Sequence, residues 1–198
     1  MLNLVRLAFA TTAIVAMTYQ FASSADTAFK KANFFSFFTI QSNLLGVAVL
    51  FLLVLVPRSR RTPLFDGARS GVVLCMALVG VVFALLLSGL QEELQTTVPW
   101  VDFVVHKLMP VVLVVDWLLD PPRQRLPWWT VPAWLSFPFL WLSYTLVRGE
   151  AEDWYPYPFV DVAKLGYDGV LARSVGLTAG FALAGAAVLW LGNRRARG

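Results

Sequence analysis

The side chains best suited to chemistry are Thr39 and the only histidine of the chain, His106. Both fall inside long apolar stretches rather than in loops. An ionisable side chain at membrane depth is costly to keep there, so His106 is a functional-site candidate. Threonine is a weak nucleophile that needs a positioned base, and an imidazole can serve as that base. The pair therefore predicts acyl-transfer chemistry if the helices bring the two side chains together.

The residues around His106 support this interpretation. Asp102 lies one helical turn earlier on the same face, where a carboxylate can orient the imidazole. Pro110 removes the backbone hydrogen bond to the carbonyl of His106 and predicts a kink there. The alternative is a histidine satisfied by a neighbouring helix, with Asp102 and Lys107 solvated at the outer boundary.

The segment that contains Thr39 is unusually polar for a membrane helix. Ser36, Thr39 and Asn43 are spaced i, i+3, i+7, so we expect one polar stripe that faces the interior of the bundle. Gln41, Ser42 and Asn43 are candidate donors to a developing oxyanion. The alternative is that these groups only hydrogen-bond neighbouring helices together.

Six apolar stretches supply the elements that must position these side chains. Most are near the ~20 residues that a helix needs to cross the hydrocarbon layer, and they are continuously apolar instead of alternating. The sequence therefore predicts an all-α fold, a single polytopic membrane bundle over residues 1–198 with six transmembrane helices. The stretches are Leu4–Phe21, Phe34–Val56, Ser70–Leu90, Val101–Leu119, Leu126–Val147 and Leu171–Leu191. The small residues that end the first stretch also fit a cleavable signal peptide, although Tyr19 and Gln20 favour a retained helix.

The basic residues predict the orientation, with both termini cytoplasmic. They cluster at the second and fourth connections and at the C-terminus: Arg58, Arg60, Arg61, Arg69, Arg123, Arg125, Arg194, Arg195 and Arg197. In this orientation Thr39 and His106 each lie about five residues, roughly 8 Å, inward from the outer face. The net charge of +4 then indicates contact with anionic lipid headgroups and no nucleic-acid partner.

Other familiar chemistries lack the residues that they need. One histidine and one cysteine, Cys75, exclude two-histidine haem ligation and multi-cysteine metal sites, and no zinc, phosphate-loop or nucleotide motif is present. We therefore expect no metal and no cofactor, and we expect Cys75 to be a buried apolar residue.

The connection before the last stretch, Trp154–Tyr167, interleaves prolines with aromatic residues. This composition predicts a semi-rigid segment at the outer headgroup level, either a lid over the helix ends or a simple interfacial anchor. Tyr144 and Arg148, one turn apart beside it, are candidates to bind a substrate carboxylate or to pair with Asp153 or Asp161.

Together these motifs resemble the androgen-induced integral membrane proteins, in a bacterial branch of that family, over nearly the whole chain. The matching residues are Phe37-Phe38-Thr39-Ile40-Gln41-Ser42-Asn43, His106 ahead of Pro110, and Tyr144, Arg148-Gly149, Tyr155-Pro156-Tyr157-Pro158-Phe159, Asp161 and Gly166-Tyr167. The resemblance implies an intramembrane threonine hydrolase that cleaves fatty acid esters of hydroxy fatty acids or other lipid and acyl esters. It also implies Thr39 as the nucleophile and His106 as the base.

Two competing hypotheses remain from the residues alone. One is a non-enzymatic carrier or proton-coupled transporter, in which His106, Asp102 and Asp116 relay protons. The other is a hydrolase with a different nucleophile, since Ser88 and Ser143 also lie near the outer boundary.

The predicted orientation has a direct test. A cysteine introduced at Gly198 should react with a membrane-impermeant thiol reagent only after the cytoplasmic side is opened, because the arginine-rich ends face the cytoplasm. Labelling of that cysteine in intact cells would reverse the orientation.

Overall fold

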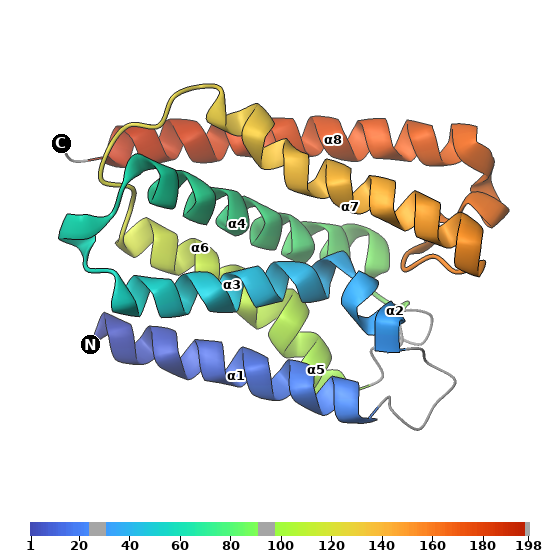
Figure 1. The fold of residues 1–198 in the computed structure, drawn as a ribbon, viewed down its shortest axis with the longest axis horizontal. Coiled ribbons are helices and arrows are strands. Elements are labelled where there is room, and N and C mark those ends of the chain that lie inside the picture. The colour runs from blue at the N-terminus through green and yellow to red at the C-terminus, as the bar shows by residue number, and fades with distance from the viewer. Residues whose placement is uncertain (24–30, 91–97, 197–198) are drawn as a thin grey trace.

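Five helices in the computed structural model are long and apolar enough to cross a membrane, which is compatible with a multi-pass membrane protein (Figure 1). The structure describes residues 1–23, 31–90 and 98–196, and it is helical without strands over those ranges. The five are α1 (Leu2–Ser23), α3 (Phe38–Leu55), α4 continued by η2 (Pro63–Val82 and Phe83–Leu87), α7 (Thr130–Glu152) and α8 (Val162–Arg195). The all-α prediction is confirmed for these residues.

The fourth predicted span is divided into three pieces, α5 (Pro99–Phe103), the π-helix η3 (Val104–Leu108) and α6 (Met109–Leu119). Pro110 has no N–H to donate to the carbonyl of His106, and the N–H of Met109 reaches back five residues to Val104. The irregularity predicted from Pro110 therefore takes the form of a π-helix. Because no piece alone has the length of a span, the sixth span stays a prediction.

The second predicted span is not one continuous helix, which corrects the sequence-based prediction. Phe37 is extended (φ −68°, ψ 128°) and separates α2 (Lys31–Ser36) from α3 (Phe38–Leu55). Side chains satisfy backbone groups freed at this break. The indole of Trp141 donates to the carbonyl of Ser36 at 2.9 Å. Such partners are needed because water is absent from the hydrocarbon layer.

The last helix, α8, is longer than the predicted stretch Leu171–Leu191 and contains a break of its own. Gly166 has φ +66° and ψ 167°, a conformation that glycine adopts without steric cost. Two short 3₁₀ turns, η1 (Arg58–Arg60) and η4 (Pro158–Val160), complete the described elements.

The helices pack in pairs, α1 against α3, α4 against α6 and α7 against α8 (Figure 1). Ala10, Ala13 and Ala16 are fully buried on one side of α1, where their small size lets helix backbones approach closely. Cys75 is buried in α4, as predicted. The start of α1 and the end of α8 lie at the same end of the bundle, so the two termini share a side (Figure 1); which side it is remains a prediction.

At this end, charged side chains, all buried except Arg58, join four elements in a network that we call the arginine clasp. Its members are Arg6, Arg58, Arg61, Arg69, Asp116 and Asp120. Arg6 of α1 contacts both carboxylates at 2.7 Å. Arg61 contacts Asp120 at 2.7 Å and Arg69 of α4 contacts Asp116 at 3.0 Å. The clasp thus fixes the ends of α1, α4 and α6 relative to one another.

The clasp sets the charge state of Asp120. Burial acts to raise the pKa of this carboxyl, but hydrogen bonds from Arg61 and Arg6 outweigh it and lower the pKa from 3.8 to about 2. Because the pKa is lower in the folded protein, this stabilisation is present above pH 3.8 and is lost as the pH falls towards 2. It amounts to about 2 kcal/mol.

We predict that Asp120→Asn lowers the melting temperature of the protein in detergent, because it leaves Arg6 and Arg61 buried without this partner, a loss of about 3–5 kcal/mol. Asp168→Asn, on an exposed residue of α8, is the matched control. The wild-type protein should also lose more stability than Asp120→Asn between about pH 4 and pH 2. Equal melting temperatures for the two variants would contradict a structural role of the clasp.

Candidate active site

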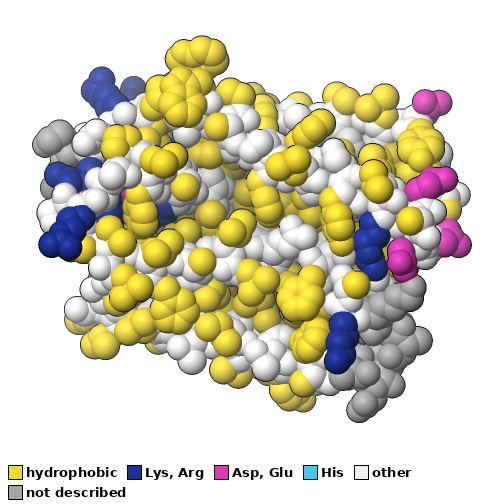
Figure 2. Space-filling model, viewed as in Figure 1, with side chains coloured by type: hydrophobic (Ala, Val, Ile, Leu, Met, Phe, Trp, Pro, Cys, Tyr) yellow, Lys and Arg dark blue, Asp and Glu magenta, His cyan; other side chains and the backbone are white. Residues whose placement is uncertain are grey.

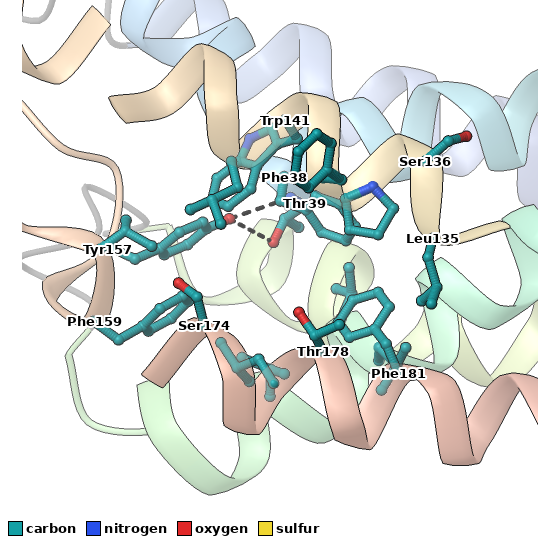
Figure 3. A pocket seen from close by; sticks show the side chains of 18 of the residues that line it. Phe38, Thr39, Leu135, Ser136, Trp141, Tyr157, Phe159, Ser174, Thr178 and Phe181 are labelled. Atoms are coloured by element: carbon teal, nitrogen blue, oxygen red, sulfur yellow. Dashed lines mark hydrogen bonds between the residues drawn. The ribbon is translucent and has the colours of Figure 1, made fainter. Parts of the chain in front are cut away.

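Thr39 lies in the first turn of α3, just after the break at Phe37. Its backbone N–H, which has no partner within the helix, donates to the hydroxyl of Tyr157 at 3.2 Å. The Thr39 hydroxyl lies 3.3 Å from the same phenol oxygen (Figure 3). Tyr157, 118 positions away in the sequence, thus contacts both the backbone N–H and the side-chain hydroxyl of Thr39.

Tyr157 is held in place by aromatic neighbours. Its ring packs against Phe37, Trp141 and Phe159 with centroid distances of 5.7, 5.7 and 5.2 Å. Burial raises the pKa of the Tyr157 phenol, so this hydroxyl keeps its proton at neutral pH. It can therefore act as a hydrogen-bond donor but is unsuited to be a base. The sequence singled out the run that contains Tyr157 as a lid or an interfacial anchor, but nothing in that run pointed to a contact between Tyr157 and Thr39.

Thr39 and Tyr157 lie in the wall of a pocket of about 390 Å³. Its other walls come from α4, α7 and α8 and are mainly apolar, with Leu78, Leu135 and Phe181 among them. Ser136, Ser174 and Thr178 also line it. Figure 3 shows Ser174 and Thr178 of α8 across the pocket from Thr39, whereas the Ser136 hydroxyl points away and donates to the carbonyl of Ala133. An apolar cavity of this size with a few polar groups is typical of a small-ligand site.

His106 occupies the centre of the π-helix η3 and is 4% exposed. Its Nδ1 lies 2.9 Å from Oδ1 of buried Asp102, as the i, i+4 spacing predicted. The ring of Phe83, the first residue of the π-helix η2, stacks on the imidazole. The ring centroids are 4.1 Å apart and the angle between the ring planes is 12°. π-Helices frequently occur at functional sites. Nε2 of His106 has no hydrogen bond to the part of the chain that the structure describes.

Thr39 and His106 were expected at the same depth, where the helices could bring them together, but the structure shows no direct contact between them. His106 is absent from the lining of the Thr39 pocket, because Asp102 fixes one edge of the imidazole and Phe83 covers a face. Asn43 connects the two regions. Its amide donates to the carbonyl of Thr39 at 2.9 Å and to that of Val105, the neighbour of His106, at 3.1 Å.

The other predicted residues divide between this region and the helix break. Ser36, Thr39 and Asn43 are all buried, as the stripe predicted. Beside Thr39, the hydroxyl of Ser42 and Oδ1 of Asn43 are buried without a partner among the described residues. Gln41 instead donates to the carbonyl of Phe35 at 2.9 Å, so its amide caps the end of α2.

Tyr144 and Arg148 also serve the helix break rather than the pocket. The Tyr144 hydroxyl lies 2.9 Å from Oγ of Ser36, and Arg148 donates to Ser36 at 2.9 Å and to Asn33 at 2.6 Å. The predicted pairing of Arg148 with Asp153 or Asp161 is therefore wrong. Asp161 instead caps the start of α8.

The alternative nucleophiles lie outside the pocket. Ser143 is exposed and donates to the carbonyl of Phe139 within its own helix at 3.0 Å, and Ser88 is exposed at the end of η2. Neither residue lines the Thr39 pocket.

The segment Trp154–Tyr167 packs into the end of the bundle opposite the two termini, with Val160 buried to the same degree as the core (Figure 1). Its position depends on Gly149 of α7, because a Cβ atom there would lie 2.0 Å from the ring of Tyr155. This close approach places Tyr155, and two residues later Tyr157, against the helices.

A scan against protein-family models finds no match, and searches of the curated proteins and of the solved structures find none either.

We predict that Gly149→Ala displaces Tyr155 and lowers the melting temperature, since overpacking of this kind typically costs about 1–3 kcal/mol. Gly176→Ala in α8 is the matched control, because a Cβ there meets no atom within 4 Å and alanine favours the helix. If Gly149→Ala is as stable as Gly176→Ala, the segment is not positioned by this contact.

Proposed function

We propose that the protein is an intramembrane hydrolase of lipid or fatty-acyl esters in the cell membrane, with Thr39 as nucleophile and His106 as base. Fatty acid esters of hydroxy fatty acids are one substrate class suggested by the resemblance in sequence. The observation that carries the proposal is a threonine hydroxyl in the wall of a largely apolar pocket of 390 Å³, beside a protonated phenol. Acyl chains match such walls.

Polar groups near Thr39 support the assignment of roles. Asp102 orients the imidazole through Nδ1, which leaves Nε2 of His106 to exchange a proton. No direct hydrogen bond joins Nε2 to the Thr39 hydroxyl among the described contacts, so the proposed proton path requires one bridging water. The unpartnered oxygens of Ser42 and Asn43 offer acceptors for that water.

The reaction then proceeds in two acyl-transfer steps. The Thr39 oxygen attacks the ester carbonyl while its proton passes through the water to His106. The tetrahedral intermediate collapses, the bond to the alkoxy oxygen breaks, and the alcohol leaves with the proton from His106. Water, activated by the same imidazole, next attacks the acyl-threonine and releases the acid and free Thr39. The Tyr157 hydroxyl donates to the developing oxyanion.

The carrier hypothesis receives less support from the contacts. A proton relay from His106 would continue through Asp116, but the two oxygens of that carboxylate are bound by Arg6 and Arg69. A relay partner needs a carboxylate that is free to gain and lose protons. The clasp therefore gives Asp116 a structural role.

We predict that purified protein hydrolyses a long-chain p-nitrophenyl ester and that Thr39→Ala and His106→Ala each lose about 10²–10⁴-fold in turnover. Thr39→Ser should keep part of the activity because it retains the hydroxyl. Tyr157→Phe should lose about 10²-fold because it removes the oxyanion donor.

Ser88→Ala and Ser143→Ala are the matched controls and should retain wild-type turnover. Labelling with a fluorophosphonate probe, followed by mass spectrometry of the modified peptide, should identify Thr39. If Thr39→Ala keeps turnover and labelling while a serine variant loses both, the nucleophile is misassigned. If the wild-type protein cleaves no ester, the hydrolase proposal fails.

A further inference from the structure

A second hollow, which we call the interfacial groove, lies between the first turns of α7 and the last turns of α8, with a volume of about 660 Å³. Its floor is apolar, with Val131, Pro132 and Leu189. Its rim carries Arg125, Arg194, Trp128 and Trp190. The groove is at the same end of the bundle as the arginine clasp, where Lys and Arg side chains gather (Figure 2).

The arginines of the rim have no carboxylate partner among the described residues. The guanidinium of Arg194 stacks 4.0 Å above the ring of Trp190, which holds it at the edge of the groove. Asp116 and Asp120 are engaged in the clasp. Asp66 is buried and accepts from the backbone N–H of Arg123 through Oδ2, while its Oδ1 has no partner among the described residues, and Asp66 does not line the groove. The groove is therefore a cationic site without an internal counter-ion.

The aromatic residues place the rim at the boundary of the membrane. Trp128 and Trp190 are 78% and 55% exposed at the ends of their helices. Tryptophan is enriched at the headgroup level, where its ring can face apolar chains while its N–H stays close to water. The cationic rim thus lies at headgroup depth, and the apolar floor continues towards the hydrocarbon layer.

We propose that the interfacial groove binds one anionic phospholipid. Arg125 and Arg194 bind its phosphate from two sides, and an acyl chain lies on the apolar floor beside Pro132. The charge of the rim selects an anionic headgroup over a zwitterionic one, and the floor selects a lipid over a free anion. Pro132 also lines the Thr39 pocket, so the bound chain would end beside that pocket. The lipid site does not depend on the proposed hydrolysis.

Native mass spectrometry of the detergent-purified protein tests the proposal, with phosphatidylglycerol and phosphatidylcholine of equal chain length as probes. The wild-type protein should bind phosphatidylglycerol at least about tenfold more tightly, and Arg125→Gln/Arg194→Gln should lose that preference. Both arginines are exposed, so the variant should keep its melting temperature. Arg60→Gln/Arg173→Gln removes the same charge from exposed positions outside the groove and should bind as the wild type does.

Three outcomes would overturn the proposal. They are equal binding of the two lipids, loss of preference in the control variant to the same extent, and displacement of phosphatidylglycerol by millimolar inorganic phosphate, which would indicate a site for free anions. Ester hydrolysis by the groove variant would be measured separately, so a failure of the lipid site and a failure of the hydrolase are distinguishable.

Discussion

The candidate site depends on the need to satisfy the backbone groups that a helix break leaves without partners. At Phe37 the backbone leaves the helical path, and polar side chains from elsewhere replace the missing hydrogen bonds. Trp141 bonds the carbonyl of Ser36, and Tyr157 accepts from the N–H of Thr39. The phenol that satisfies the helix start is therefore also the group closest to the proposed nucleophile. The hydrogen bond from the Thr39 N–H to Tyr157 thus satisfies the start of α3 and also holds the phenol beside the proposed nucleophile.

The features predicted best from the sequence are those set by local spacing. Asp102 and His106 are four residues apart on one helix face, and Pro110 disturbs the turn that contains them, so both effects follow from helix geometry. The break at Phe37 was missed because no proline or glycine marks it between Lys31 and Leu45. Its stabilisation comes from Trp141 and Tyr157, more than one hundred residues later.

Long-range pairing also explains why the arginine clasp was not predicted. The arginines were interpreted as topology signals, which depend only on charge and sequence position. Arg61 and Arg69 are nevertheless buried, because Asp116 and Asp120 are spaced i, i+4 on α6 and meet them on one face. A pair of carboxylates on an apolar helix is costly without partners, so the spacing of Asp116 and Asp120 indicates that cationic partners exist. The spacing does not indicate which arginines those partners are.

The two sides of the bundle are held together by different interactions. Charges join α1, α4 and α6, whereas α7 contacts α4 mainly through Trp134, which donates to the carbonyl of Gly67 at 2.8 Å and packs on Gly71. The Thr39 pocket and the interfacial groove both lie along α7 and α8. The cavities thus occur on the side where the described residues form no buried ion pair of the kind seen in the clasp.

The clasp also constrains the order of events during synthesis. Arg6 precedes its partner Asp116 by 110 residues, so the ribosome makes the cation of this pair well before the carboxylate. Until α6 has been translated, the first helix carries a cation that has no carboxylate to meet and that is costly to hold in the lipid interior. The ion pair between α1 and α6 can therefore form only after α6 has been translated.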